Sequence, residues 1–348
     1  DLSKPNPSYR PRFLSEKNQI VHNVVRNTGV VFGEADGIHL IQTADNDVSY
    51  NTVSHTGYNG ILMMGLQDLT MGYRAFRYQK PPADYDRLTH NYLKNNRITH
   101  NDISDIMTQG NDGGAIYTHS NGINNTISHN YIHDVLVGAT SHPDMAVFGI
   151  YLDGGRSDGF NINNNLIVIT DPHSVAVTMN GSNNVFQNNT LYSTQPNHLL
   201  QVLPGDVQSN NVFTNNVFTN TNPGAHTLVI YSMYTGKRWY PGDPTPAGSY
   251  VYNSKSKATD PDQFWIMTPK PIIGASENNV FYTAAGGGTN ATYGVISTWN
   301  GWVGEFKNGV WNPIIYRVPV SKWRTNPGPG YTTGFDLNST FSVKPAFM

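Results

Sequence analysis

Ile20-Val21-His22-Asn23-Val24-Val25 is the first copy of a six-residue phrase: an apolar residue, two variable residues, an asparagine, one variable residue and a second apolar residue. The other copies begin at Val48, Ile98, Ile127, Ile162, Phe186 and Phe213. Successive phrase asparagines lie 28, 50, 29, 35, 24 and 27 residues apart. A short unit that keeps its internal pattern is typical of a solenoid, and the longer intervals predict loops.

The phrase predicts a β-strand, because its spacing of apolar residues around the asparagine fits a two-residue period. Stacked asparagines can hydrogen-bond from one unit to the next. No unit contains ten residues with helical periodicity, and Asn, Gly and Thr are poor helix formers. A second apolar strand lies between consecutive phrases, as in Gly37-Ile38-His39-Leu40 and Gly149-Ile150-Tyr151-Leu152. We therefore predict an all-β fold, a parallel β-helix with long loop insertions.

The composition fits one large all-β domain. The chain has 348 residues, of which 13% are charged and 38% hydrophobic, with 33 Gly, 21 Pro and no Cys. We assign residues 1–230 to β-helix coils with an insertion at 66–95, and residues 231–348 to a loop-rich C-terminal coil region of the same domain. The lack of Cys excludes a disulfide scaffold, and a net charge of −2 predicts no general attraction to nucleic acid or membranes. No run of 18 apolar residues is present, so we expect no transmembrane helix.

The first repeat begins close to the start of the sequence. The coils begin at about Asn18, and residues 1–19 offer little that could cover the hydrophobic face of a terminal coil. Terminal units of a solenoid need such a cover. We therefore expect further polypeptide to cover the first coil, either an N-terminal portion outside this sequence or a second chain.

Two glycine-rich segments carry the most concentrated polar side chains. They are Asn111-Asp112-Gly113-Gly114-Ala115-Ile116-Tyr117-Thr118-His119 and Gly149-Ile150-Tyr151-Leu152-Asp153-Gly154-Gly155. Glycine lets a ligand approach the backbone, tyrosine offers a stacking face and a hydroxyl, and a carboxylate supplies proton transfer or nucleophilic attack. A pair of carboxylates is the minimum for glycoside hydrolysis. The alternative interpretation is structural, because Asp-Gly is a common turn former.

The two segments resemble the paired motif of β-helix glycoside hydrolases, especially family 141 and, more loosely, family 120. The similarity covers roughly residues 18–230 in the style of the repeat, and its specific part is Asp112 to Thr118 together with Gly149 to Asp153. The resemblance implies a right-handed helix, an exposed glycan cleft, and Asp112 and Asp153 as the catalytic acids. Family 141 includes α-L-fucosidases and xylanases, so the resemblance implies a chemistry without naming the sugar.

The register of the two segments sets a geometric condition on this pair. If the two Ile-Tyr sequences stack, Asp153 lies over His119, whereas Asp112 lies about seven positions away along the strand. A straight strand would separate the carboxylates by ~23 Å, so the pair requires a bend at Gly113-Gly114, a position where glycines mark kinks. The same register places Glu34 at the depth of Asp112 two coils away, which makes Asp112 and Glu34 a competing pair.

Further residues complete the predicted site. The candidates for substrate binding are Tyr117, His119, Tyr151, Glu34, Asp36, His39 and, in the insertion 66–95, Arg74. A structural role is an equal alternative for His119. No H-x-H or HExxH spacing is present, so we expect no metal ion and no other cofactor.

Basic residues are scarce in this part of the chain. Between Ile98 and Gly236 the one Lys or Arg is Arg156, whereas a polysaccharide lyase or uronate epimerase needs a cation to neutralise the uronate. The sequence therefore favours a glycosidase that acts on a neutral plant or algal glycan. Lyase or epimerase activity, and a non-catalytic carbohydrate-binding or tailspike role, stay open as alternatives. We expect a secreted or periplasmic bacterial location, although the residues given include no signal peptide.

Overall fold

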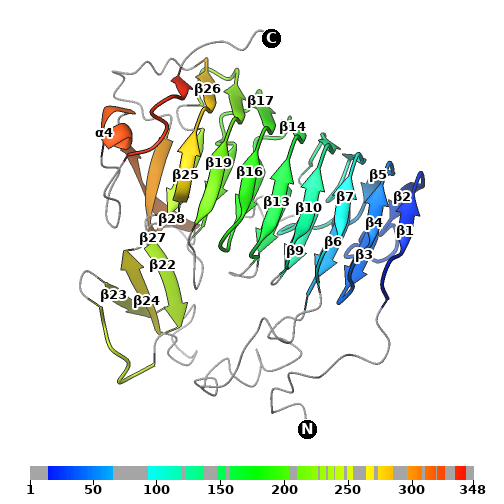
Figure 1. The fold of residues 1–348 in the computed structure, drawn as a ribbon, viewed down its shortest axis with the longest axis horizontal. Helices are drawn as coiled ribbons and strands as arrows, with labels where there is room; N and C mark the ends of the chain where they lie inside the picture. Colours follow the sequence, from blue (N-terminus) through cyan, green and yellow to red (C-terminus); the bar gives the residue numbers. More distant parts are fainter. Residues whose placement is uncertain are drawn as a thin grey trace.

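Three long sheets wind around one core, and their strands follow one another in a fixed order in each coil (Figure 1). The computed structural model describes residues 15–65, 93–119, 122–136, 147–153, 157–203, 210–225, 228–232, 234–238, 240–246, 249–253, 264–269, 273–284, 296–307, 310–318, 320–325 and 334–341. Successive coils pair in parallel in all three sheets. The predicted parallel β-helix is therefore confirmed.

Sheets I, II and III take one strand each from successive coils. Sheet I contains β1 (Gln19–Val21), β4 (Asp47–Ser49), β7 (Arg97–Thr99), β10 (Asn125–Ser128), β13 (Phe160–Asn163), β16 (Val185–Gln187), β19 (Asn211–Thr214) and β25 (Ile273–Glu277). Sheet II contains β2 (Val24–Thr28), β5 (Thr52–Thr56), β8 (Asp102–Ser104), β11 (Tyr131–Ile132), β14 (Leu166–Ile169), β17 (Thr190–Ser193), β20 (Val217–Asn220), β26 (Val280–Thr283) and β29 (Thr340–Phe341).

Sheet III carries the predicted site. It contains β3 (Ile38–Ile41), β6 (Ile61–Met64), β9 (Gly114–His119), β12 (Val147–Asp153), β15 (Ser174–Met179), β18 (Leu200–Val202), β21 (Val229–Ser232), β27 (Ile296–Lys307) and β28 (Val310–Val318). Only β28 runs antiparallel to its neighbour in this sheet. A separate antiparallel sheet contains β22 (Tyr234–Arg238), β24 (Phe264–Pro269) and β23 (Tyr250–Asn253), and it projects from the C-terminal coils in Figure 1.

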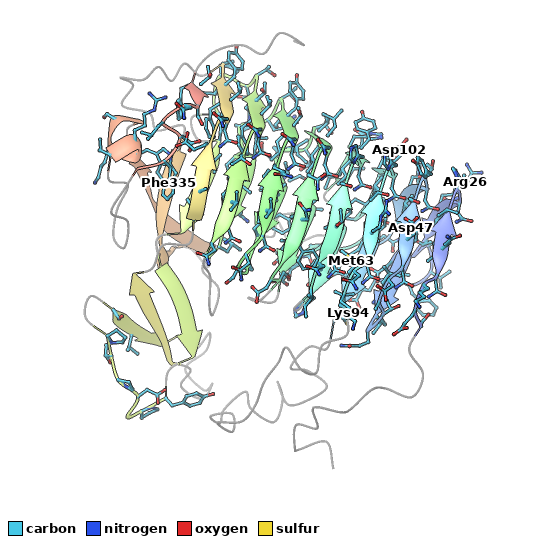
Figure 2. The ribbon with its side chains drawn as sticks, viewed as in Figure 1. Arg26, Asp47, Met63, Lys94, Asp102 and Phe335 are labelled. Carbon is cyan, nitrogen blue, oxygen red and sulfur yellow. The ribbon has the colours of Figure 1, made fainter. Side chains whose placement is uncertain are left out.

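Each asparagine phrase forms a corner between two sheets, which corrects the prediction of a single strand. In the first copy, Asn23 separates β1 of sheet I from β2 of sheet II. The residue before the asparagine has a left-handed backbone, with φ of 58° at His22, and this residue turns the chain. The two apolar residues of the phrase therefore face the same core from two different sheets, and side chains of successive coils line up in rows (Figure 2).

The phrase asparagines form a continuous ladder along this corner. The Asn101 side-chain amide and backbone N–H both donate to Asn130 Oδ1, each at 3.0 Å. The same side-chain amide donates to the carbonyl of Val48 at 2.9 Å. The ladder members are Asn23, Asn51, Asn101, Asn130, Asn165, Asn189, Asn216 and Asn279. This arrangement confirms the predicted alignment of the seven phrase asparagines.

A second asparagine ladder, which the sequence analysis missed, runs along the entrance to sheet I. It contains Asn18, Asn46, Asn96 and Asn125, and after an interruption Asn184 and Asn211. Phe160 occupies the interrupted position, because it pairs with Asn125 in sheet I. An asparagine stands five positions before the phrase asparagine in six of the seven copies. This spacing could have predicted the second ladder.

The two ends of the core are finished differently. Helix α4 (Val320–Thr325) lies at the C-terminal end, where Trp323 is fully buried and packs on Phe335 at a ring-centroid distance of 5.4 Å (Figure 1). In the first coil Ile20 is only partly buried, whereas its partner Val48 is fully buried. Residues 1–14 lie outside the described ranges. The expectation that further polypeptide covers the first coil stays a prediction.

Strands of sheets I and II continue past residue 231, within the C-terminal coil region of 231–348. β25 extends sheet I, while β26 and β29 extend sheet II. Among the helices of the described residues, none is both long and apolar enough to cross a bilayer.

Candidate active site

The outer face of sheet III carries a row of side chains that crosses the first coils. The register aligns His39, Leu62, Tyr117, Tyr151, Thr178 and Gln201. The rings of Tyr117 and Tyr151 lie 5.1 Å apart, and Tyr151 also contacts Phe148 at 4.3 Å between centroids. These rings belong to an apolar cluster separate from the main core. Both tyrosines are thus held by packing, and their hydroxyl groups lie close to the acidic side chains of this face.

Asp153 ends β12 and lies at the position that the register predicted. It pairs with His119 of β9, and the His119 Nε2 lies 3.7 Å from Asp153 Oδ2. The Tyr117 hydroxyl donates a hydrogen bond of 2.9 Å to the same oxygen. The predicted residues His119 and Tyr117 therefore both lie next to the predicted catalytic carboxylate of Asp153.

Asp112 lies just before β9, at the bend that the pairing requires. Its φ of 58° is left-handed, so the chain turns there instead of continuing the line of the strand. The Tyr151 hydroxyl lies 3.5 Å from Asp112 Oδ1 and is also within hydrogen-bonding reach of Asp153. Both carboxyl groups therefore lie beside the Tyr151 hydroxyl.

The pKa of the Asp112 carboxyl group is raised above its ordinary value. Burial, together with the negative charge of Asp153, raises the pKa of Asp112, and the Tyr151 and His119 contacts oppose this shift only in part. Asp112 nevertheless keeps an exposed surface through which a ligand can reach it. Burial and the charge of Asp153 also raise the pKa of Tyr117 and of Tyr151, so both phenols stay protonated and act as donors. The raised pKa favours the protonated form of Asp112 more than in an ordinary aspartate.

Asn59 holds the bend before β9 in place by a hydrogen bond to its backbone, and it was not predicted from the sequence. It is fully buried, its Nδ2 donates to Asp36 Oδ1 at 2.9 Å, and its Oδ1 accepts the N–H of Gly114 at 2.8 Å. A Cβ at Gly113 would lie 2.4 Å from Asn59 Oδ1, so this position requires glycine. The strand register places Asp36, Asn59 and Gly114 in one row, and that row was the signal available in the sequence.

Asp36 and His39 form a second cluster one coil before Asn59. The His39 Nδ1 lies 3.3 Å from Asp36 Oδ2. Burial raises the pKa of Asp36, although the hydrogen bond from Asn59 and the nearby His39 oppose the shift. Burial lowers the pKa of His39, with Asp36 acting in the opposite direction. Asp36 is linked to the bend near Asp112 because Asn59 binds both Asp36 and the Gly114 N–H.

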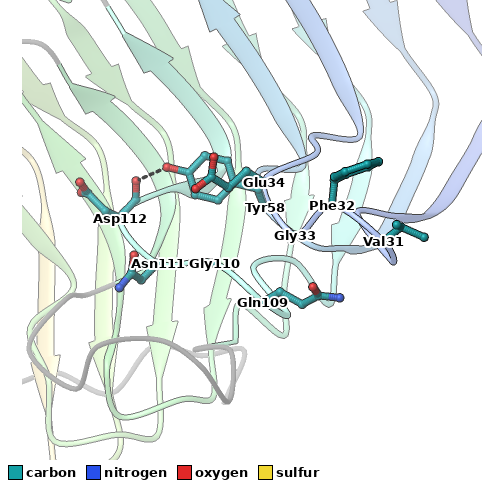
Figure 3. A pocket seen from close by; sticks show the side chains of 9 residues that line it. All are labelled: Val31, Phe32, Gly33, Glu34, Tyr58, Gln109, Gly110, Asn111 and Asp112. Atoms are coloured by element: carbon teal, nitrogen blue, oxygen red, sulfur yellow. Dashed lines mark hydrogen bonds between the residues drawn. The ribbon is translucent and has the colours of Figure 1, made fainter.

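Tyr58 lies close to four acidic residues of this region, and it was not predicted from the sequence. Its hydroxyl donates to the backbone carbonyl of Asp112 at 3.1 Å (Figure 3). Burial, followed by the charges of four carboxylates, raises the pKa of Tyr58 to about 12; the carboxylates are Asp112, Asp36, Glu34 and Asp153. Glu34 and Asp112 line one pocket together with Tyr58, so the competing pair also lies in this region.

Some predicted features lie outside the described residues. Arg74 and most of the insertion 66–95 belong to the undescribed residues 66–92, and Arg156 to residues 154–156. Within the described ranges, no group of three or more His, Cys, Asp or Glu side chains is placed to hold a metal ion.

Sequence comparison places the chain in a family defined by its fold. The profile of the right-handed β-helix region matches residues 13–191, more than half of the 348 residues. The chain therefore belongs to the right-handed β-helix family, and the handedness implied by the resemblance is confirmed. No curated protein and no solved structure matches the chain.

Proposed function

We propose that the protein is a glycoside hydrolase that cleaves a neutral plant or algal poly- or oligosaccharide, with Asp112 and Asp153 as its catalytic carboxylates. One observation carries the proposal: both carboxyl groups lie beside the Tyr151 hydroxyl. Burial and the charge of Asp153 also raise the pKa of Asp112. Glycosidases need a protonated acid and a carboxylate at the scissile bond. The resemblance to families 141 and 120 supports the same chemistry.

Asp112 is the general acid in this proposal, because a raised pKa keeps a carboxyl group protonated closer to neutral pH. It transfers its proton to the glycosidic oxygen as the C–O bond breaks. Asp153 either attacks the anomeric carbon or takes a proton from the attacking water, and water supplies the new hydroxyl group. The hydrogen bond from the Tyr117 hydroxyl to Asp153 Oδ2 holds this carboxyl group in position.

The remaining predicted residues position the sugar. Tyr117 and Tyr151 present hydroxyl groups beside the pair while their buried rings are held by packing, and His119 lies next to Asp153. The proposal covers both a retaining and an inverting reaction. Such an enzyme acts on glycans outside the cytoplasm, so the proposal includes a secreted or periplasmic bacterial location.

Two other functions remain as alternatives. A polysaccharide lyase or uronate epimerase would need a cation facing the uronate, whereas the described residues around the pair are acids, tyrosines and histidines. A non-catalytic carbohydrate-binding or tailspike protein would not need the acids at all.

The test measures sugar release from xylans, mannans, glucans and fucosylated glycans by wild type, Asp112→Asn and Asp153→Asn. General acid–base groups contribute about 10²–10⁴-fold, so we expect losses of that size in both variants. Asp45→Asn is the matched control: Asp45 also has a left-handed φ, of 57°, and its structural equivalent in the next coil is Asn95. Full turnover in both site variants contradicts the assignment. Unsaturated products indicate a lyase, and binding without product indicates a carbohydrate-binding protein.

A further inference from the structure

A pocket of about 670 Å³ opens beside Asp112 on the side of the first coil. Its walls come from the segments that connect sheet II to sheet III in three successive coils: residues 31–34, Tyr58 and residues 109–112. The volume lies within the range of roughly 300–1,000 Å³ that is usual for small-molecule sites. Figure 3 shows Asp112 at one side of this space and Phe32 at the other.

The two sides of the pocket differ in chemistry. Val31 and Phe32 are 82% and 81% exposed, although both are large apolar residues. Exposed apolar side chains beside polar groups mark ligand-binding surfaces. The opposite wall supplies Asn111 and Asp112, and Glu34 adds a second carboxyl group. An apolar face opposite several hydrogen-bonding groups suits a pyranose ring, which has C–H faces and a rim of hydroxyl groups.

Asp112 belongs to both the pocket and the carboxylate pair. Asp153 is one coil further along the helix axis, on β12, whereas Phe32 lies two coils in the other direction, before β3. Coils are about 4.8 Å apart, so Asp153 and Phe32 are separated by roughly 14 Å along the helix axis. A linear glycan that passes the pair along the axis would place its next units in the pocket.

We propose that this pocket is a saccharide-binding subsite, which binds the units next to the scissile bond with Phe32 as the stacking platform. This inference rests on the proposed glycosidase and adds a direction: the substrate is an oligo- or polysaccharide that extends toward the first coil. Glu34 determines which ligand charges the subsite prefers. The described lining residues include two carboxyl groups and no Lys or Arg, so the subsite accepts hydroxyl-bearing sugars and rejects uronates by repulsion.

The experiment measures binding by calorimetry in an Asp153→Asn background, so that the probes are not cleaved. The probes are β-1,4-linked xylose, mannose and glucose oligomers from monomer to hexamer, together with glucuronate-substituted xylose oligomers. We expect the affinity for at least one neutral series to rise with length. Phe32→Ala should weaken the longer oligomers by about three- to tenfold. Val24→Ala, an equally apolar change at a residue 66% exposed outside the pocket, should leave every affinity unchanged.

Glu34→Gln tests the charge preference by a gain of binding. This variant keeps the shape and hydrogen-bonding groups of Glu34 but removes its charge, so the glucuronate-substituted oligomers should bind several-fold more tightly. The inference is overturned if no probe binds, or if Phe32→Ala and Glu34→Gln both bind every probe like the background. Hydrolysis by wild type with no role of Phe32 retains the glycosidase and overturns the subsite. Length-dependent binding through Phe32 without hydrolysis retains the subsite and contradicts the glycosidase.

Discussion

Two corners of the coil serve opposite purposes. The asparagine corner, between sheets I and II, repeats a left-handed residue and an asparagine in each copy of the phrase. The acidic corner, between sheets II and III in the first three coils, comprises residues 29–37, 57–60 and 105–113. These three connections differ in length and sequence. They place Glu34, Asp36 and Asp112 around Tyr58, and Asp153 at the end of β12 is the fourth acid near it. Regular repetition thus stabilises the solenoid, whereas the departure from it creates a site.

The two corners also differ in how they satisfy buried polar groups. In the asparagine corner, neutral amides pair with one another and with backbone groups. In the acidic corner, carboxyl groups lie close together, and the pKa of Asp112 is raised by burial and by its like-charged neighbour Asp153. Such arrangements reduce stability and are common at functional sites. Removing a polar group should therefore have opposite consequences at the two corners.

Asn101→Ala should have the largest effect on stability. Asn101 is 1% exposed, its Oδ1 accepts from two groups of Asn51, and its amide satisfies the carbonyl of Val48. The alanine variant leaves these buried groups without partners, at about 1–3 kcal/mol each, so we expect a loss of about 3 kcal/mol or more in the free energy of unfolding. Chemical denaturation measures it. Activity per folded molecule should stay at the wild-type level, and a selective loss of activity would assign this corner a direct functional role.

Asn59→Ala makes the same change at the acidic corner, where we expect activity to suffer more than stability. Asn59 joins Asp36 to the N–H of Gly114 and thereby positions the bend that carries Asp112. Displacement of a catalytic group by about 1 Å can cost 10²-fold, so we expect turnover to fall at least tenfold while KM changes little. Asn59→Asp should restore part of the turnover, because it keeps an acceptor for the Gly114 N–H. A fall in stability without a change in turnover would reduce Asn59 to a structural residue.

The difference between the corners also explains what the sequence predicted. The asparagine corner repeats, so its spacing predicted the fold and the stacking of asparagines, although the bend within each phrase was missed. That bend depends on a left-handed residue whose identity varies, as with His22, Tyr50 and Asn164. A pattern of apolar residues two apart fits one strand as well as a corner.

The acidic corner could be predicted only in part. The register correctly placed Asp153 over His119, and the glycine pair signalled the bend at Asp112. Tyr58 and Asn59 escaped notice because they lie in a short connection with no acid or glycine pair of its own. Their roles come from neighbours 54 and 55 residues later in the chain, Asp112 and Gly114. Contacts of that separation follow from the stacking register rather than from local sequence.

The pKa of Asp112 should fall in the Asp153→Asn variant. The charge of Asp153 is the second cause of the raised pKa, after burial, so its removal brings the pKa closer to the ordinary value but leaves the effect of burial. A ¹³C NMR titration of the aspartate carboxyl groups measures this, with Asp45→Asn as the control that leaves the Asp112 curve unchanged. An unchanged pKa in Asp153→Asn would show that the two groups do not interact.

The same raised pKa predicts the pH dependence of the wild-type reaction. If Asp112 donates a proton in the rate-determining step, kcat/KM should fall about tenfold per pH unit above its pKa. The sign follows from the acid role, because the deprotonated form cannot protonate the leaving oxygen. A limb that falls toward acid instead, with no alkaline limb, would assign Asp112 the role of base or nucleophile.

Asp112→Asn should raise stability slightly at neutral pH while it removes turnover. The folded state holds the Asp112 proton to a higher pH than the unfolded state, whose group titrates near the ordinary value of 3.8. Stability therefore declines as the pH rises from about 3.8 through the raised pKa, and the full penalty applies above it. Asparagine avoids this penalty and tolerates the left-handed φ of 58° at this position. Because Asp112 is partly exposed, solvent screening limits the expected gain to about 1–2 °C in Tm.

Thermal unfolding at neutral pH and again below pH 3.8 measures the difference, which should vanish at the lower pH. A variant that is less stable than wild type at neutral pH would show that the Asp112 carboxylate is held by favourable contacts, as the amides of the asparagine corner are.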